Sequence, residues 1–410
     1  MINQITTNGS IVTAVTMNGF LYVGGSFTNL NGFACSNFAE ISLVTGNPTG
    51  FFPLFDGPVV SMAVCGSKLV VVGQFSYVDA VSNSAIAIID QPTRTFSNVL
   101  SNLGLTDQTS IFVGPSQKAF PYKAKYHTNS GFCFVGGYFW LSDGTNIRQG
   151  VLAFNPTSNT ILPFNPLINQ QNFNGWDIDQ TNNKLFHPLS TGAPWVGAWD
   201  LSTITSISIS SWSPQCTIQK TPSIFCVNGK VFISDGSGNA GVFASDVSSN
   251  VYYGMVAVDA VTGVLDGVNW QMSKNAFLGD IRVNSIVYSG GYYYVGGSWS
   301  HVLCDASNPN LNLQQALYSA PRPSLMVRDS SNGYIFKGDN VAFNGPAIIH
   351  YIPPSSFYQN EPDIIQSIIL DEAHLHLFGS ITWVDGQPGN THYIMNADGT
   401  RFQDRFLYLI

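Results

Sequence analysis

The sequence predicts an all-β fold made of a repeated unit of about fifty residues, and this rests on its composition and on one recurring glycine motif. Glutamate occurs three times and lysine nine times in 410 residues, so two of the best surface helix formers are nearly missing. Gly, Ser, Thr, Asn and Asp, which favour turns, are abundant beside Val, Ile, Phe and Tyr, which favour strands. The composition therefore indicates many short strands joined by tight turns.

The recurring motif is a hairpin turn, four or five apolar residues, a glycine pair and then an aromatic residue. Its clearest copies are Asn18–Phe27, Ser130–Phe139 and Gly290–Trp299. Looser copies occupy Ser67–Phe75, Asn228–Ser234, Asn332–Gly338 and Ala373–Gly379, with a degenerate one at Asn183–Pro188. The repeat glycines are Gly24, Gly25, Gly73, Gly136, Gly137, Gly296, Gly297, Gly338 and Gly379.

The residue types of the motif follow from its expected place between two neighbouring units. A strand covered on both faces reads as a continuous apolar run and does not alternate. The glycine pair lets the chain bend sharply, or approach a neighbouring backbone where a Cβ would clash. The aromatics expected to pack as wedges between units are Phe27, Phe75, Phe139 and Trp299. A cofactor-binding glycine motif is the alternative, and repetition along the whole chain favours the structural interpretation.

Each glycine motif lies between other strand-like segments. An apolar run such as 11–15 precedes it, and two runs joined by a Gly or Asx turn follow it, as in 36–54. Four antiparallel strands of this kind form a propeller blade. We therefore expect a single β-propeller domain over residues 1–410, with seven or eight four-stranded blades. Pairing of the strand-like residues 1–5 with the blade containing 391–410 is expected to close the ring.

The run Tyr22–Thr28, followed by Gly32 and by a strand ending in Thr45-Gly46, resembles the kelch-like repeats of the "VGGxF" type. Those repeats occur in bacterial surface propellers and in fungal cell-polarity surface proteins. The resemblance covers most of the chain, strongly in three copies and weakly in the others, and it implies the propeller fold. It implies no activity, because propellers host enzymes, receptors and scaffolds alike. The segments around His187 and over 301–318 depart most from the pattern.

Charge and hydropathy argue against two classes of partner. The formal charge of −8 is spread thinly, and sixteen cationic residues scattered over the chain form no patch for phosphates, so we expect no nucleic-acid partner. No apolar run approaches the roughly 18 residues of a membrane span, so we expect no membrane insertion. Six cysteines lie far apart; Cys133 is expected to be a buried free thiol, while a bridge between Cys216 and Cys226 stays open.

Known catalytic signatures are missing from the sequence, including the nucleophile elbow, the zinc-protease helix, the phosphate loop and the EF-hand loop. His374 and His376 lie two apart on a predicted strand and so share one face, where a metal site is conceivable. Their alternation with Leu375 and Leu377 favours a solvent-facing polar stripe instead. We expect no catalytic residue, no cofactor and no metal, and hence no enzyme.

Location is inferred from the start of the chain and from its composition. Met1–Asn8 has no signal-peptide pattern, whereas a surface poor in Lys and Glu and rich in Asn, Ser and Thr is typical of exposed proteins. This combination predicts a virion protein assembled in the host cytoplasm. The alternative is an extracellular or cell-surface protein that is expressed without its leader.

The function we expect is a non-enzymatic structural or attachment module, a virion or phage-tail component that mediates protein–protein contacts. Its partners would be copies of itself or other structural proteins, or a host surface glycan or receptor. One alternative is a secreted or cell-surface carbohydrate-binding propeller, and a third is a hydrolase or lyase that uses unmarked aspartates. Partner contacts are expected near the irregular insertions 104–121, 236–253 and 301–318.

Overall fold

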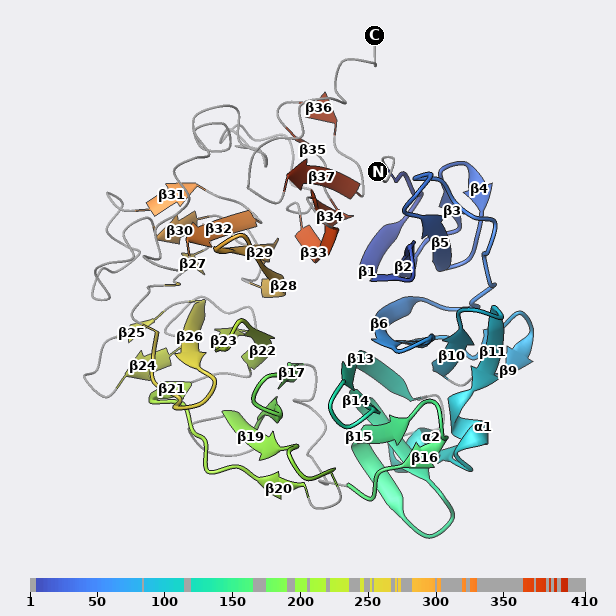
Figure 1. Cartoon of the computed structure of the whole chain (residues 1–410), viewed down its shortest axis with the longest axis horizontal. Coiled ribbons are helices and arrows are strands. Elements are labelled where there is room, and N and C mark those ends of the chain that lie inside the picture. Colours follow the sequence, from blue (N-terminus) through green and yellow to red (C-terminus); the bar gives the residue numbers. More distant parts are fainter. Residues whose placement is uncertain are drawn as a thin grey trace. The chain divides into compact units, whose positions relative to one another are not determined.

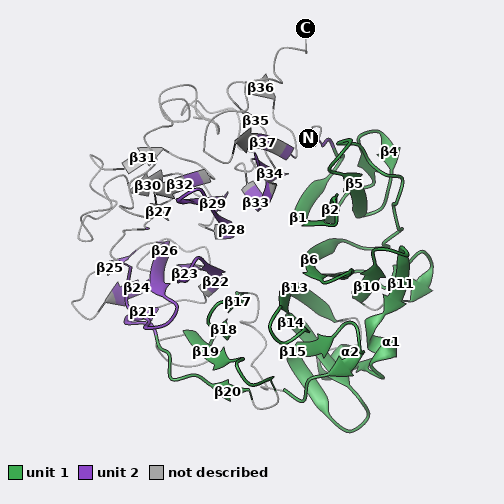
Figure 2. Cartoon of the chain, viewed as in Figure 1, with its two compact units in different colours: residues 1–3, 7–213 green, residues 4–6, 214–410 purple. Residues whose placement is uncertain are grey.

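The computed structural model describes residues 5–396 except 83–84, 114–118, 165–174, 190–195, 205–206, 219–221, 236–243, 247–250, 253, 267–269, 271, 274–281, 299–300, 304–318, 322–324, 330–363, 372–373, 381–382, 385–386 and 389–391. Its regular structure is strand apart from two short helices, α1 (Val99–Asn102) and α2 (Thr109–Val113) (Figure 1). None of the helices in the described part is long and apolar enough to cross a membrane. The chain divides into two compact units, one of residues 1–3 and 7–213 and the other of residues 4–6 and 214–410 (Figure 2).

The described residues of unit 1 form four main antiparallel sheets, which follow one another in chain order. The first two are β1 (Ser10–Met17), β2 (Phe20–Ser26) and β5 (Phe38–Ser42), then β6 (Val59–Cys65), β7 (Lys68–Gly73), β10 (Ile86–Asp90) and β11 (Thr95–Asn98). The third is β12 (Thr106–Asp107), β13 (Phe120–His127), β14 (Phe132–Ser142), β15 (Ile147–Asn155) and β16 (Thr160–Ile161). The fourth is β17 (Asp177–Asp179), β18 (Lys184–Pro188), β19 (Val196–Asp200) and β20 (Ser208–Ile209). Two small hairpins accompany the first two sheets: β3 (Asn29–Leu30) with β4 (Phe33–Ala34), and β8 (Tyr77–Val78) with β9 (Val81–Ser82).

Unit 2 contains antiparallel sheets of the same kind. Its three main sheets are β22 (Pro222–Val227), β23 (Lys230–Asp235) and β26 (Met255–Asp259); β28 (Arg282–Ser289), β29 (Tyr292–Ser298) and β32 (Leu325–Asp329); and β33 (Ile364–Asp371), β34 (His374–Ser380) and β37 (His392–Asn396). Shorter strands form β21 (Cys216–Ile218) with β24 (Ala244–Asp246) and β25 (Val251–Tyr252), β27 (Met272–Ser273) with β30 (His301–Leu303) and β31 (Ser319–Pro321), and β35 (Trp383–Val384) with β36 (Gln387–Pro388). The segments expected to be irregular therefore carry structure of their own: 104–121 holds β12 and α2, 236–253 holds β24 and β25, and 301–318 holds β30.

Five sheets share one irregularity, a β-bulge between the first strand and the glycine-containing second strand. The register skips one residue of the first strand between Ile11 and Thr13, Val59 and Ser61, Pro121 and Lys123, Val283 and Ser285, and Ile365 and Ser367. In every case the residue before the skip pairs with a glycine, namely Gly25, Gly73, Gly137, Gly297 and Gly379. A bulge bends the strand and increases its twist, so these sheets share one local shape.

The glycine opposite the bulge is needed because a backbone carbonyl occupies the place of a side chain. A Cβ on Gly25 would lie 1.9 Å from the carbonyl oxygen of Ser10, and one on Gly73 would lie 2.1 Å from that of Pro58. Both distances are far inside van der Waals contact, and the obstacle is backbone, which cannot rotate away as a side chain can. At this position only glycine fits.

The first glycine of the pair has a different neighbour. A Cβ on Gly24 would lie 2.5 Å from Cγ1 of Val59 in the next sheet, and one on Gly296 would lie 2.6 Å from Cγ2 of Ile365. These obstacles are side chains of the adjacent sheet, which can shift. The constraint is therefore weaker, and Val72 holds the equivalent place in the second sheet.

In the second copy of the motif, a single glycine stands in place of the pair. Its cross-strand pairing makes Gly73 the counterpart of Gly25 and not of Gly24. With that alignment, Phe75 occupies the same place as Phe27, and no residue is missing. Composition could not reveal this, because the glycine that matters is defined by the strand opposite it.

The apolar strands pack into cores that run from one sheet into the next. One cluster joins Tyr22 and Phe38 of the first sheet to Val71 and Phe75 of the second, and Phe75 meets Phe55 edge-on at 4.8 Å between ring centroids. A second cluster joins Val70 and Val72 to Phe139 of the third sheet. Phe27 is also buried, while Trp299 and Gly338 lie outside the described residues.

The fold is an all-β propeller fold, but its repeat is less uniform than the sequence suggested. If the bulge opposite a glycine defines the blade, the described residues contain five such blades and not seven or eight, because the sheets built on β18 and β23 pair without it. Their motif copies lack the glycine pair. Only three of the described sheets have four or more strands. Residues 1–4 and 397–410, which would pair to close a ring, lie outside the described part, so closure stays a prediction.

The bulge contact predicts a large cost for one methyl group. We expect Gly73→Ala to lower the free energy of unfolding by more than about 3 kcal/mol, because either the bulge or β7 must move. Gly66→Ala is the matched control: Gly66 has a φ of +65° but open space around its Cβ, so about 1–2 kcal/mol is expected there. Urea unfolding followed by tryptophan fluorescence measures both, and equal costs would contradict the contact.

Candidate functional site

A buried polar site surrounds Glu40, in the middle of the apolar strand β5. That strand is buried from Phe38 to Ile41, and the Glu40 side chain is fully buried with it. A buried carboxylate is costly unless it is paired and hydrogen-bonded. Glu40 was not singled out from the sequence, although a charge within a repeat position that is otherwise apolar was the available signal.

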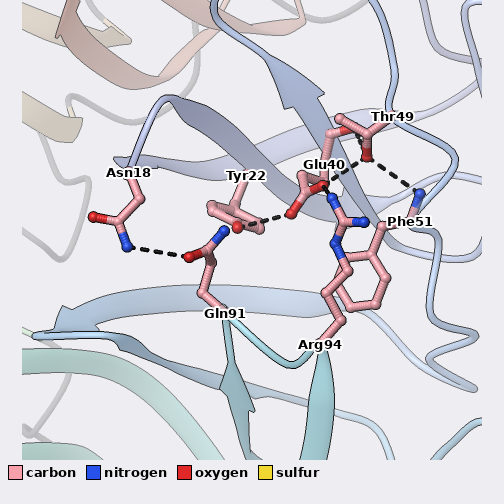
Figure 3. Close-up of polar contacts among 7 residues, drawn as sticks. All are labelled: Asn18, Tyr22, Glu40, Thr49, Phe51, Gln91 and Arg94. Carbon is pink, nitrogen blue, oxygen red and sulfur yellow. Dashed lines mark hydrogen bonds and ion pairs between the residues drawn. The ribbon is translucent and has the colours of Figure 1, made fainter.

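Three donors satisfy the carboxylate (Figure 3). The Tyr22 hydroxyl donates to Oε2 at 2.8 Å, while the Thr49 hydroxyl and Nη2 of Arg94 donate to Oε1 at 2.7 and 2.6 Å. Tyr22 belongs to the neighbouring strand β2, and its cross-strand pairing with Glu40 fixes the first contact. Thr49 lies in the segment after β5, and its backbone N–H also donates to the Glu40 carbonyl at 3.0 Å.

Arg94 brings a second sheet to this site. It lies in the turn between β10 and β11 with a φ of +56°, and its side chain is 43% exposed. Its guanidinium lies 5.4 Å from the ring centroid of Phe51 and 5.9 Å from that of Phe20, within the range of cation–π attraction. The Arg94–Glu40 ion pair therefore joins the first and second sheets of unit 1.

The chemistry of the Glu40 site suits a lock between sheets. Both carboxylate oxygens are occupied by donors, and neither has an exposed surface for a reacting molecule. Burial, and then the hydrogen bond to Glu40, raise the pKa of the Tyr22 hydroxyl, so it stays a proton donor at physiological pH. Nearby, the Asn18 side chain donates to Oε1 of Gln91 at 3.1 Å and adds a second polar contact between the same sheets (Figure 3).

Similar contacts join other neighbouring sheets at the bulge itself. The hydroxyl of Ser61, which follows the bulge of β6, accepts the N–H of Ala124 in the next sheet at 3.1 Å. Ser285 of β28 does the same for Ile368 at 3.1 Å. In the third sheet the equivalent residue is Lys123, whose ammonium donates to the Trp176 carbonyl at 2.6 Å. The bulge therefore directs a polar side chain onto the backbone of the following sheet.

Buried aspartates are the residues that a hydrolase would need, and the structure shows what they do. Asp177 is 3% exposed and lies 3.2 Å from the ammonium of Lys125 and 3.8 Å from that of Lys123. Asp179 accepts the backbone N–H of Thr181 at 2.9 Å and the side-chain amide of Asn182 at 2.6 Å, which shapes the β17–β18 turn. Each carboxylate thus has a local structural task.

A second repeated feature is a polar side chain just before the first strand of each of the first two sheets, which accepts two backbone N–H groups. Oδ1 of Asn8 accepts the N–H groups of Thr28 and Asn29 at 2.9 and 3.0 Å. Asp56, at the matching place in the next repeat, accepts those of Ser76 and Tyr77 at 2.7 and 2.9 Å. These side chains hold the small hairpins β3–β4 and β8–β9 in place. This contact was not predicted, although the pairs Asn8-Gly9 and Asp56-Gly57 mark it in the sequence.

The hairpins that are held in this way expose apolar side chains. Each hairpin buries one residue, Leu30 or Val78, beneath it. Phe33, Tyr77 and Val81 are 52%, 50% and 59% exposed, and Leu54 in the adjoining segment is 58% exposed. We call these residues, together with Phe52, the hairpin patch. Phe52 contacts Phe33 at 6.0 Å between ring centroids, and Leu54 exchanges hydrogen bonds with Asp79 of the β8–β9 turn.

The expectation of a solvent-facing stripe at His374 and His376 is wrong for His376. Its side chain is 2% exposed, because β34 is covered on both faces and alternation therefore does not separate core from solvent. No group of three or more potential metal ligands occurs in the described part of the chain. The five cysteines described there form no disulfide, including Cys133, Cys216 and Cys226, and Cys304 lies outside the described part.

Comparison with known proteins gives structural neighbours only. No family model and no curated protein matches the sequence. The computationally designed Ika8 protein covers 95% of this chain and 98% of its own at 8% identity and a TM-score of 0.45. The match to the β-propeller domain of Cps50 (Swd1) from Myceliophteria thermophila covers 92% of this chain and 96% of that domain, at 11% identity and a TM-score of 0.44. The match to the RRP9 WD40 repeats covers 95% of this chain and 96% of that chain, at 10% identity and a TM-score of 0.47.

The Glu40 lock predicts unequal costs for two ion pairs. We expect Arg94→Met to lower the free energy of unfolding by roughly 2–4 kcal/mol, because the buried carboxylate loses its counter-charge. Lys68→Met is the control, since its pair with Asp90 is 3.6 Å long with both side chains partly exposed, and at most about 1 kcal/mol is expected. Urea unfolding of the two variants measures the difference. A similar cost for both would mean that Glu40 does not depend on Arg94.

The Asp56 contact predicts a local loosening of the β8–β9 hairpin. We expect Asp56→Ala to speed amide hydrogen exchange at Ser76 and Tyr77 by about tenfold or more, since each N–H loses a charge-assisted acceptor. Asp143→Ala is the control, because Asp143 accepts the N–H groups of Thr145 and Asn146 in a different turn. Exchange followed by mass spectrometry reads both sites. Unchanged exchange at Tyr77 would show that the hairpin is held by other contacts.

Proposed function

We propose that this protein is a non-enzymatic scaffold that makes protein–protein contacts through the hairpin patch. One observation supports the proposal above the others: the two small hairpins are fixed by dedicated acceptors, Asn8 and Asp56, yet present apolar side chains to solvent. Apolar surface that is held rigid is suited to binding, because little conformational entropy is lost when a partner covers it.

The partner we propose is a second copy of the same chain. An apolar patch can pair with its own copy across a two-fold axis without bringing like charges together. The nearest carboxylates, Asp56 and Asp79, accept backbone N–H groups of their own unit, which partly offsets their charge. Protein partners of this kind agree with the expectation from the sequence that the chain binds copies of itself.

The finer role is also a proposal. We propose a structural or attachment component of a virion or phage tail, assembled in the host cytoplasm, and its support is the composition and the scarcity of Lys and Glu. That the repeats are of the kelch-like type, and that pairing of the termini closes the ring, also remain predictions. Fractionation of purified particles tests the role, and absence of this polypeptide from them would exclude it.

The carbohydrate-binding alternative needs exposed aromatic faces that can stack on sugar rings. The tryptophans whose side chains the structure describes are all buried: Trp140, Trp176, Trp199, Trp212 and Trp270. Stacking on a sugar is therefore not available from these tryptophans, whereas Phe33 and Tyr77 of the hairpin patch are exposed to either kind of partner. A glycan array probed with the isolated protein addresses the alternative directly.

The hairpin patch predicts concentration-dependent association. We expect the wild-type protein to form dimers in sedimentation velocity runs at rising concentration, and the Phe33→Ser/Tyr77→Ser double variant to remain monomeric. The control is Val44→Ser/Val261→Ser, which removes apolar residues that are 85% and 58% exposed outside the patch and should leave association unchanged. A wild-type monomer at every concentration would refute pairing between copies.

A further inference from the structure

Two buried histidines in the last sheet of unit 2 are linked in a chain of hydrogen bonds to the N-terminal segment. His376 lies on β34 and His392 begins the neighbouring strand β37 (Figure 1). Nδ1 of His376 lies 3.0 Å from Nε2 of His392, and Nδ1 of His392 accepts the backbone N–H of Ile5 at 3.1 Å. Their exposed fractions are 2% and 1%, and Ile5 is fully buried. Residues 4–6 belong to unit 2 with both histidines.

This geometry fixes where the protons are. A backbone N–H can only donate, so Nδ1 of His392 must carry a lone pair. A neutral His392 therefore carries its proton on Nε2, which donates to Nδ1 of His376. His376 in turn is protonated on Nε2 alone. Since both nitrogens of His392 are used in this way, neither is available to a metal ion, and the chain of bonds forms only when both rings are neutral.

Adding one proton disrupts the chain of bonds wherever it goes. A proton on Nδ1 of His392 places an N–H against the N–H of Ile5. A proton on Nδ1 of His376 places an N–H against the Nε2–H of His392. The rings can avoid that clash only if His392 moves its proton to Nδ1, which again faces Ile5. Each arrangement removes the acceptor of the Ile5 amide or sets two donors against each other.

We propose that Ile5, His392 and His376 form an acid-sensitive clasp, which holds residue 5 on the last sheet of unit 2 when both rings are neutral and releases it when one ring takes up a proton. The surroundings support release over accommodation. Phe378 stacks on His392 at 4.6 Å between ring centroids; the face of this ring attracts a cation, but it offers no acceptor to replace the hydrogen bonds that a protonated ring loses. Among the described residues, the charged group that acts on His376 is His374 on the same strand β34, which is positive when protonated.

The direction of the pH dependence follows from burial. Burial, and then the charge of His374, lower the pKa of His376 to about 4, and burial lowers the pKa of His392 well below its ordinary value. A released ring regains an ordinary pKa of about 6.5. At a pH between these two pKa values, the ring is protonated in the released state and neutral in the clasped state. Release therefore becomes more favourable as the pH falls from 6.5 towards 4. For one ring, linkage predicts about a 20-fold larger release equilibrium at pH 5 than at pH 7.

The test is amide hydrogen exchange at Ile5 in the full chain, with each rate divided by the intrinsic rate at its pH. We expect the protection of Ile5 to fall about 20-fold between pH 7 and pH 5, while the amide of Leu377 in the middle of β34 stays protected. Unchanged protection of Ile5 at pH 5 would overturn the proposal. So would an equal loss at Leu377, because acid would then be unfolding the sheet and not opening the clasp.

Two variants separate the clasp from a general effect of acid. His392→Asn places an amide oxygen near the position of Nδ1, so it can accept the N–H of Ile5 but cannot take up a proton; we expect it to keep Ile5 protected with less than about a twofold change between pH 7 and 5. His187→Asn is the control, because His187 is also buried but lies in unit 1, stacked on Trp199, and should leave the 20-fold change intact. A 20-fold loss in His392→Asn would show that another group senses the pH. Loss of the change in His187→Asn would equally overturn the proposal.

Discussion

The architecture depends on one close contact, in which the backbone of the first strand of a sheet passes over the glycine of the second. The carbonyl oxygens of Ser10 and Pro58 lie where the Cβ atoms of Gly25 and Gly73 would be. Because no side chain intervenes, the first strand can bulge and twist at that point. The bulge in turn directs Ser61 and Ser285 towards the next sheet, where they accept the N–H groups of Ala124 and Ile368. The close contact within one sheet thus also positions the hydrogen bonds that join it to the next sheet.

The polar groups buried between sheets select one relative position of the two sheets, which apolar packing alone does not. Apolar clusters run from each sheet of unit 1 into the next, and such surfaces tolerate sliding. The Glu40 carboxylate does not, because it is satisfied only when Tyr22, Thr49 and Arg94 all reach it. Its burial costs free energy, and that cost is recovered in one arrangement of the two sheets. The histidines of unit 2 follow the same logic with neutral groups, which makes their arrangement sensitive to protons.

Rigid framework and exposed apolar surface are related features of unit 1. The same residues that begin each repeat, Asn8 and Asp56, also fix the hairpin that follows the glycine motif. Internal repetition therefore copies the hairpin together with the strand that supports it. In the third sheet the stretch after the glycine motif differs, since β14 and β15 pair directly as far as Ser142 and Ile147, and β12 pairs with the same end of β14. The surface can vary in this way while the bulge and its glycine persist.

The sequence by itself determined the fold class, the repeating motif and the burial of its central strands, because these depend on short-range patterns of residue type. The continuous apolar run of β7 and the turn residues Asn18-Gly19, both with positive φ, are examples that local chemistry alone decides. Tertiary structure decided which glycine carries the constraint, that Glu40 is an ion-paired lock and that His376 is buried. Each of these depends on a partner that residue type does not reveal: the strand opposite Gly73, the turn that carries Arg94, and the strand β37 that carries His392 beside His376. Residue type records what a side chain can bind, but only the folded chain determines what lies beside it.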